Sequence, residues 1–169
     1  KLAVALTGRS GEALEEYKKL MLKLNNEVVA AAPEDLLINT HVCRGNYHST
    51  FFSSGAYDSV ADLLFGEENV NAYYLEYDDE RSGGFAPLAK VSGDKKVVLG
   101  LVTTTTPALE NKELVINRIH EAAKYVPLDR LYLSPQCGFA SCEIGNKLTE
   151  EEQWAKLKLV KEIAEEVWG

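Results

Sequence analysis

The chain has few cysteines, no long apolar run and no excess of positive charge. Because it holds no run of about 18 apolar residues, we expect no membrane-spanning helix. The first residues also do not show the basic-then-apolar pattern of a signal peptide. A net charge of −8 would repel the phosphates of a nucleic acid, so no nucleic-acid partner is expected. The three cysteines are odd in number and lack disulfide-like spacing, which predicts free thiols in a reducing, cytoplasmic compartment.

Methionine is also scarce, because Met21 is the only one and the chain begins with Lys1. This start predicts a piece of a longer protein, or the ordered part of one. The 169 residues, 46% of them hydrophobic, are enough for one core. We therefore expect residues 1–169 to form a single, partial domain.

Apolar residues recur in two kinds of spacing along the chain. Spacing of three and four residues predicts helices, at residues 11–31, 57–65, 85–89, 109–125 and 150–168. Pro33 follows the first of these helices, and Thr149 with Glu152 forms a capping box at the start of the last. Short apolar runs predict strands, at residues 36–42, 70–77, 97–103 and 131–134.

Strands that alternate with helices predict a parallel sheet of an α/β protein. Four such units are about half of a (β/α)8 barrel, which needs roughly 250 residues. A small open sheet of four strands explains the same pattern. Active sites lie at the carboxyl ends of the strands in both architectures, so spacing alone leaves both open.

Residues that bind metals lie at the ends of three predicted strands. His41 and Cys43 are two positions apart, so both side chains project from the same face of the first strand. Glu76 ends the second strand and Cys137 follows the fourth. Imidazole, thiolate and carboxylate are ligands that zinc prefers. Ligands so far apart in sequence need a preformed scaffold, which is typical of a catalytic site.

The charge of such a site indicates its chemistry. Two thiolates and one carboxylate around a divalent cation leave a net charge near −1. This charge opposes the activation of water, so a hydrolase is disfavoured. The metal can still bind an incoming thiol and hold it as a thiolate ready for alkylation. We expect the Glu76 oxygen, the hardest of the four ligands, to loosen when the substrate sulfur arrives.

Other residues compete for these roles. Four further side chains are alternative ligands: His48, Asp78, Glu80 and Cys142. Arg44 binds either a substrate carboxylate or a structural partner in a salt bridge. Arg81 is expected to pair with Asp78 or Asp79, and His120 to be a surface or a helix-packing residue. The hydroxyls of residues 103–106 either bind a ligand or cap the neighbouring elements.

Three segments resemble the carboxy-terminal barrel of cobalamin-independent methionine synthase, and especially its shorter, single-barrel bacterial relatives. They are residues 41–46 with the His-x-Cys motif, residues 74–81, and residues 133–141 with the Pro-x-Cys-Gly motif. The resemblance extends from about residue 36 to residue 169. It implies that the chain is the carboxy-terminal half of a (β/α)8 TIM barrel, with strands five to eight.

The same resemblance implies a function. It is the zinc-dependent transfer of a methyl group from 5-methyltetrahydrofolate, usually polyglutamylated, to the thiol of homocysteine, which gives methionine. The zinc ligands of the family carry over, in chain order, to His41, Cys43, Glu76 and Cys137. The histidine that donates a proton in the longer enzymes has no equivalent in residues 101–106, so no catalytic acid is assigned.

Strands that hold homocysteine-binding groups in the family are absent from this chain. A related zinc-dependent thiol alkyltransferase with another thiol or donor, such as one of coenzyme M chemistry, therefore stays open. So does an inactive fragment in which the metal only fixes the strand ends. A half barrel leaves two unpaired edges and an exposed apolar face, which predicts self-association or pairing with the missing half of the barrel.

Overall fold

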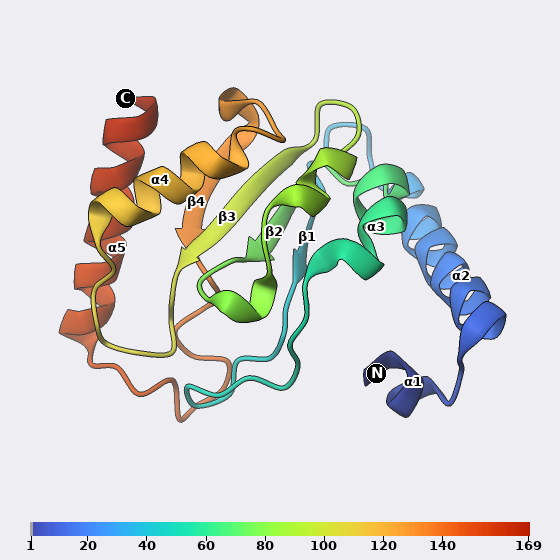
Figure 1. Cartoon of the computed structure of the whole chain (residues 1–169), viewed down its shortest axis with the longest axis horizontal. Helices are drawn as coiled ribbons and strands as arrows, with labels where there is room; N and C mark the ends of the chain where they lie inside the picture. The colour runs from blue at the N-terminus through green and yellow to red at the C-terminus, as the bar shows by residue number, and fades with distance from the viewer. Residues whose placement is uncertain (1) are drawn as a thin grey trace.

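The computed structural model describes the backbone of residues 2–169 and the side chains of residues 4–169, and it has one parallel sheet (Figure 1). The four strands lie in the order β1-β2-β3-β4 and every neighbouring pair is parallel. Their bounds are Asn39–Val42, Ala72–Glu76, Lys96–Val102 and Leu131–Pro135. The predicted parallel α/β sheet is confirmed.

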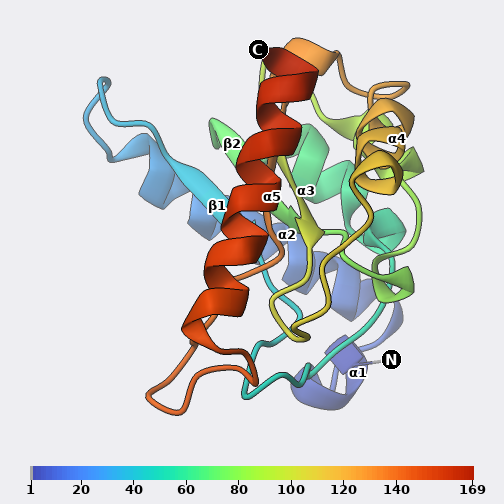
Figure 2. The same cartoon turned by 90° about the vertical axis from the view of Figure 1, so that its left-hand side faces the viewer.

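The helices cover the outer face of the sheet, with α2 beside β1 and α5 beside β4 at opposite ends (Figures 1 and 2). The α-helices are α1 (Leu2–Thr7), α2 (Gly11–Ala30), α3 (Ala61–Glu67), α4 (Lys112–Ala122) and α5 (Glu150–Trp168). Short 3-10 helices are η1 (Tyr57–Ser59), η2 (Glu80–Ser82), η3 (Ala86–Lys90) and η4 (Leu128–Arg130). No helix within residues 2–169 is long and apolar enough to cross a bilayer.

Several boundaries differ from those that the sequence predicted. The first strand begins at Asn39 rather than at residue 36, because Leu36 and Leu37 are exposed and outside the ladder. The predicted helix at residues 57–65 is divided into η1 and α3. Helix α4 begins only at Lys112, since the Asn111 side chain accepts a hydrogen bond from the Leu114 N–H and caps it there. Helix α1 was not predicted.

The core lies between the sheet and the helices. Alternate residues of β2 and β3 point to this side, and they include Tyr73, Leu75, Val97 and Leu99, all at most 1% exposed. Aromatic rings extend the core from α3 toward η3, with centroids 4.6–5.7 Å apart. Tyr74 and Tyr132 are exposed on the opposite face, which no helix of residues 2–169 covers (Figures 1 and 2). In β2 and β3 the helix-covered side of the sheet is therefore fully buried, whereas the opposite side is exposed at Tyr74 and Tyr132.

A glycine allows the chain after β4 to approach the middle of the sheet. A Cβ atom on Gly100 would lie 2.7 Å from the Leu75 carbonyl oxygen and 2.9 Å from the Gln136 Cα. These distances are shorter than any ordinary Cβ contact, so a side chain at this position would push β3 away from its neighbours. The missing side chain lets residues 136 and 137 sit close to the end of β2.

Helix α5 is fixed to the end of β3 by a buried ion pair that the sequence pattern did not predict. Lys156 is fully buried, and its Nζ donates to the Ala108 carbonyl at 2.7 Å and to both Glu110 oxygens at 3.1 Å. Glu110 also accepts a hydrogen bond from the Thr103 N–H at 2.8 Å. The predicted capping box of Thr149 and Glu152 is confirmed at the start of the helix.

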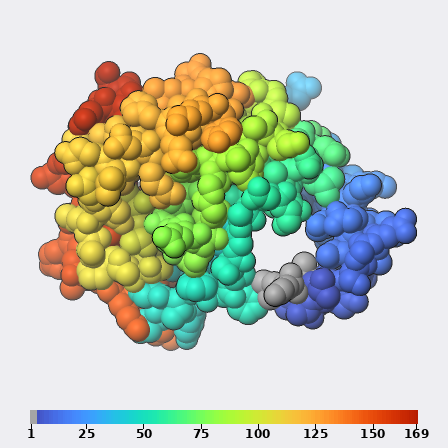
Figure 3. All heavy atoms as spheres, viewed as in Figure 1, coloured from blue at the N-terminus to red at the C-terminus, as the bar shows by residue number. Residues whose placement is uncertain are grey.

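Helix α2 packs less tightly than the other long helices. An apolar cavity of about 280 Å³ separates it from α3, between Leu14, Tyr17 and Met21 on one side and Val60 and Leu64 on the other. Figure 3 shows the molecule hollowed in this region. No residue of α2 is buried. Its amino-acid pattern is amphipathic, so α2 has more apolar surface than the described residues cover.

We predict that Ile163→Ala lowers the free energy of unfolding by about 2–5 kcal/mol, because Ile163 is the fully buried apolar contact of α5 and its loss leaves a cavity. Urea denaturation followed by circular dichroism measures the change. Leu114→Ala on the exposed side of α4 is the control and should change stability by less than about 0.5 kcal/mol. Equal effects of both substitutions would contradict this packing of α5.

Candidate metal centre

The parallel register brings the carboxyl ends of the strands to one edge of the sheet. His41 lies opposite Tyr74 in β2, and Glu76 lies opposite Gly100 in β3, which in turn lies opposite Ser134 in β4. Cys43 and Cys137 follow the ends of β1 and β4. Residues that are up to 96 positions apart in the chain thus meet at one place.

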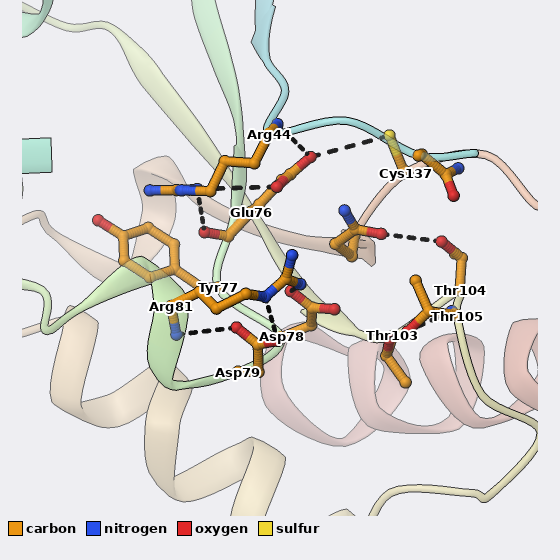
Figure 4. Close-up of polar contacts among 12 residues, drawn as sticks. Arg44, Glu76, Tyr77, Asp78, Asp79, Arg81, Thr103, Thr104, Thr105 and Cys137 are labelled. Atoms are coloured by element: carbon orange, nitrogen blue, oxygen red, sulfur yellow. Dashed lines mark hydrogen bonds and ion pairs between the residues drawn. The ribbon is translucent and has the colours of Figure 1, made fainter. Parts of the chain in front are cut away.

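The four predicted ligand residues form one cluster. Their ligand atoms, one each from His41, Cys43, Glu76 and Cys137, all lie within 4.8 Å of one another. The Cys137 Sγ is 3.7 Å from the Cys43 Sγ and 3.3 Å from the His41 Nε2. The Glu76 Oε1 is 3.9 Å from both the Cys137 Sγ and the His41 Nε2. Figure 4 shows the Cys137 sulfur and the Glu76 carboxylate facing each other.

These separations fit a tetrahedral cation. Zinc–sulfur bonds of about 2.3 Å and zinc–nitrogen bonds of about 2.0 Å give a tetrahedron with edges of roughly 3.3–3.8 Å. The four distances given above span 3.3–3.9 Å. The donor set of two sulfurs, one nitrogen and one oxygen also suits zinc. Geometry and donor chemistry therefore both accommodate this ion.

Two of the ligands are oriented by backbone groups. The His41 Nδ1 lies 3.1 Å from the Tyr74 carbonyl oxygen, so Nδ1 carries the proton and Nε2 faces the cluster with its lone pair. The Cys43 Sγ accepts a hydrogen bond from the Gly45 N–H at 3.3 Å. Gly45 has φ of +97°, and a Cβ there would meet the Phe52 backbone at 2.7 Å. Only glycine fits this turn.

Glu76 is the fully buried member of the cluster, and Arg44 compensates its charge. The Arg44 backbone N–H donates to Glu76 Oε1 at 3.0 Å, and the guanidinium Nη1 lies 3.8 Å from Oε2. Tyr57 holds this arginine, because its hydroxyl accepts from Nη1 at 2.8 Å and its ring lies 4.2 Å below the guanidinium. The Glu76 Oε2 has no hydrogen-bond partner. The oxygen that faces the other ligand atoms is Oε1, and a buried carboxylate in this position suits a cation as neighbour.

The cluster concentrates groups that become negative when they ionise. Burial, together with the neighbouring Cys43 and Glu76, raises the pKa of the Cys137 thiol to about 12. The Gly138 backbone N–H opposes this rise. Such a site disfavours several negative charges in the absence of a cation, and a bound cation would remove the repulsion.

Two loops that carry the cysteines are fastened to each other. The Asn46 Nδ2 donates to the Gly138 carbonyl at 2.6 Å, and the Asn146 Nδ2 donates to the Asn46 Oδ1 at 2.8 Å. Farther along, the His48 Nδ1 lies 3.0 Å from the Gly145 carbonyl oxygen, and the Ser49 N–H donates to the Asn146 Oδ1. These bonds hold the loop after β1 against the loop after β4.

The structure separates the competing ligands from this centre. Within the described residues, the cluster of possible metal ligands contains neither His48 nor Cys142. It also contains neither Asp78 nor Glu80. Asp78 is buried next to Arg81 and Thr103, and burial raises the pKa of its carboxyl group.

Arg44 is too enclosed to receive a substrate carboxylate. It is 7% exposed, and its guanidinium donates to the Gly55 and Glu76 carbonyl oxygens and to Tyr57. Of its two predicted roles, the structural salt bridge is the one observed. Arg81 pairs with Asp79 and Asp78, as predicted (Figure 4).

The threonine hydroxyls are used within the protein. Thr103 and Thr105 bond to each other at 2.9 Å, and the fully buried Thr104 donates to the Gln136 Oε1 at 2.8 Å (Figure 4). Of the two roles predicted for these hydroxyls, ligand binding and structural capping, the observed bonds favour the structural role. His120 is exposed on α4, so it is a surface residue.

Two residues near the centre were missed by reasoning from the sequence. Tyr57 supports Arg44 and Glu76 from a distance of 13 and 19 positions, so no local pattern indicates it. Gln136 is buried beside Cys137, and its Nε2 has no hydrogen-bond partner. In the sequence, only the position of Gln136 directly before the predicted ligand Cys137 could have indicated that it lies near the centre.

A pocket of about 300 Å³ opens beside the cluster. Its lining includes His41 and Cys137 together with Tyr74 and Ser134. The pocket therefore gives a small molecule access to two of the four ligand side chains. It lies at the uncovered face of the sheet.

Fold and site together define a parallel α/β protein with a cluster of soft ligands that could hold a metal ion at the carboxyl ends of its strands. The family described as "Cobalamin-independent synthase, Catalytic domain" matches residues 15–166. The chain belongs to this family, the one that its motifs resemble.

Individual relatives agree with this assignment. The uncharacterised protein YxjG of Bacillus subtilis strain 168 is 52% identical over 159 residues, which are 94% of this chain and 42% of YxjG. The crystal structure of a candidate vitamin-B12-independent methionine synthase from Listeria monocytogenes is 40% identical with a TM-score of 0.72, over 96% of this chain and 43% of that one. The chain thus spans less than half the length of both relatives and is similar to half of the Listeria barrel.

A B12-independent methionine synthase from Shewanella sp. W3-18-1, solved in complex with selenomethionine, has a TM-score of 0.71 at 21% identity. The match covers 90% of this chain and 44% of that chain. At this identity the likeness concerns the fold alone. It shows that the arrangement of strands and helices is kept while most side chains differ.

We predict that Tyr57→Phe lowers the affinity for zinc about 10–100-fold, because the hydroxyl that positions Arg44 and accepts the Glu76 N–H at 2.9 Å is lost. The free energy of unfolding should also fall by about 1–3 kcal/mol, since buried donors are left unpaired. Competition with a chromogenic chelator measures the affinity. Tyr125→Phe, at an exposed position, is the control and should leave both quantities unchanged. Unaltered zinc affinity in the Tyr57 variant would contradict the supporting role.

Proposed function

We propose that His41, Cys43, Glu76 and Cys137 bind one zinc ion, and that the complete barrel transfers a methyl group from 5-methyltetrahydrofolate, as the polyglutamate, to the thiol of homocysteine to form methionine. The observation that carries the proposal is the approach of these four ligand atoms to within 4.8 Å of one another. Membership of the family supports the reaction class. The activity is proposed for the complete barrel, because this chain spans less than half of its relatives.

When bound, zinc supplies a Lewis acid that keeps a substrate thiol deprotonated at neutral pH. The residues of the chain prepare this place. The bond from His41 to the Tyr74 carbonyl directs the free imidazole nitrogen inward. The Arg44 guanidinium offsets part of the negative charge at Glu76. The pocket beside Cys137 offers the substrate a wall of Tyr74 and Ser134.

The chain is further proposed to be one partial domain, residues 1–169, that supplies strands five to eight of a (β/α)8 barrel. The parallel order of the four strands and the likeness to half of the Listeria structure support this assignment. A reducing compartment such as the cytoplasm would keep Cys43 and Cys137 free for the metal, since a disulfide between them would remove two ligands.

Metal analysis tests the proposed ligands. We expect the zinc-loaded chain to retain about one zinc per molecule after gel filtration. Cys43→Ser and Cys137→Ser should each lose most of it, because a hydroxyl is a poor ligand for zinc compared with a thiolate. Cys142→Ser is the matched control and should retain the metal, since this third cysteine is outside the cluster. Full retention in both of the first two variants would refute the site.

X-ray absorption at the zinc edge tests the thiol chemistry. Addition of homocysteine is expected to add one sulfur neighbour and remove one light-atom neighbour, because the Glu76 oxygen is the hardest ligand. Methionine, which has no thiol, should leave the spectrum unchanged. A spectrum that is unaltered by millimolar homocysteine would favour a purely structural metal. Methyl-transfer assays with homocysteine and with other thiols, on the complete barrel, then identify the acceptor.

A further inference from the structure

Polar contacts hold helix α2 against the α3 region at two places, about two helical turns apart. At the first, the Lys18 Nζ donates to the Ser59 carbonyl at 3.3 Å. At the second, the Asn26 Nδ2 donates to the Glu67 carbonyl at 2.9 Å, and the Asn69 N–H donates to the Asn26 Oδ1 at 2.8 Å. The apolar side chains between these places leave the cavity described above unfilled. The cavity is therefore built into the way the two helices are joined.

The walls of this cavity are mostly apolar. Leu14, Tyr17 and Met21 line it from α2, and Val60 and Leu64 line it from the α3 side. Apolar cavities stay free of ordered water and accept apolar molecules, and a volume of about 150 Å³ is enough for benzene. A cavity of about 280 Å³ has room for an aromatic ring or a branched alkyl group with a short chain.

A buried carboxyl group without a cation lines the same cavity. Glu68 is 3% exposed, and none of the ion pairs among the described residues includes it. Its Oε1 accepts a hydrogen bond from the Asn25 Nδ2 at 3.2 Å, while its Oε2 has no partner. The buried Glu76, in contrast, has Arg44 beside it. Glu68 thus lacks the compensation that a buried carboxylate normally has.

The pKa of this carboxyl group agrees with the missing compensation. Burial raises the pKa of Glu68, and the hydrogen bond from Asn25 and the charge of Lys95 oppose the rise only in part. The Lys95 Nζ is engaged elsewhere, since it donates to the Ser92 Oγ at 2.7 Å and to the Phe65 carbonyl at 3.4 Å. The surroundings therefore leave Glu68 in need of a further positive group.

These features select one class of ligand. A primary ammonium group has several N–H donors and a positive charge, so it satisfies both the free oxygen and the charge of a buried carboxylate. An uncharged alcohol would satisfy only the oxygen, and an anion would be repelled. A purely apolar molecule would fill the space but leave the Glu68 Oε2 unpaired.

We propose that the cavity between α2 and α3 binds a small apolar amine, whose ammonium group donates to the Glu68 Oε2 and whose apolar part contacts Leu14, Met21 and Leu64. This site goes beyond the proposed methyl transfer. The residues that line the cavity include none of the four clustered metal ligands, so the inference does not depend on the zinc chemistry.

Met21 provides a single reporter for this cavity, because it is the only methionine of the chain and lines the cavity. The chain is produced with isotope-labelled methionine methyl groups, and the Met21 signal in the NMR spectrum is assigned by its absence in Met21→Leu. All samples contain a chelator, so that a metal at the other site does not bind the amine. We expect phenethylamine, a cation at neutral pH, to shift the Met21 signal until it saturates.

Two further probes test the recognition of charge. Phenethyl alcohol has the same size and shape but no charge, and it should bind about tenfold more weakly than phenethylamine. Phenylacetate, an anion, should not shift the Met21 signal at millimolar concentrations. These comparisons use the unaltered chain and so do not depend on the folding of a variant.

Matched variants locate the ammonium group. Glu68→Gln retains the length of the side chain but removes its charge, so it should lower the affinity for phenethylamine about 10–100-fold. The affinity for phenethyl alcohol should stay within about twofold, because no charge is paired in that complex. Glu67→Gln removes the same charge at the exposed neighbouring position and should leave both affinities unchanged.

Three results would overturn the proposal. The first is a Met21 signal that phenethylamine does not shift while circular dichroism shows the helices of the chain folded. The second is equal affinity for phenethylamine and phenethyl alcohol in the unaltered chain. The third is an affinity for phenethylamine that Glu68→Gln and Glu67→Gln change equally.

Discussion

The centre depends on a carboxylate that is completely removed from water. Burying a single charge costs several kcal/mol unless it is paired and hydrogen-bonded. Glu76 meets this requirement through Arg44, which gives it both a backbone N–H and a guanidinium, and through Tyr57, which fixes that guanidinium. Arg44 follows β1 and Glu76 ends β2, so the same contacts align two strand ends. The contacts that align the ends of β1 and β2 therefore also orient the Glu76 oxygen toward the two thiols.

The cysteines, in contrast, are positioned by loops, and loops need their own constraints. The bonds among Asn46, Gly138 and Asn146 supply these constraints without any metal. Because the sulfur atoms are already 3.7 Å apart, a cation would not have to order the loops before binding. The cost is electrostatic, since groups that ionise to negative charge are held together. A bound cation would therefore relieve this repulsion, and little of its binding free energy would be needed to order the loops.

The sequence predicted the parts of the fold that depend on local patterns. Strand and helix order, the capping box at Thr149 and the convergence of strand ends follow from periodicity and parallel pairing. The late start of β1 and the buried pair of Lys156 and Glu110 do not, because they depend on tertiary packing. Helix α1 was not predicted either. The four clustered ligand residues were found, as soft donors at strand ends are recognisable. Tyr57 was not, since its contacts to Arg44 and Glu76 exist only in three dimensions.

The position of the ligands within the chain separates two functions that a barrel combines. All four clustered residues come from this one half, and the contacts that orient them also lie within it. Metal binding should therefore survive without a partner. The substrate pocket differs, because it opens on the uncovered face of the sheet and shares Tyr74 and Ser134 with a hollow on that face. Under the proposed function, this chain would hold the metal through its own residues, while part of the wall that selects the thiol would come from outside the chain, so metal affinity and substrate affinity need not change together.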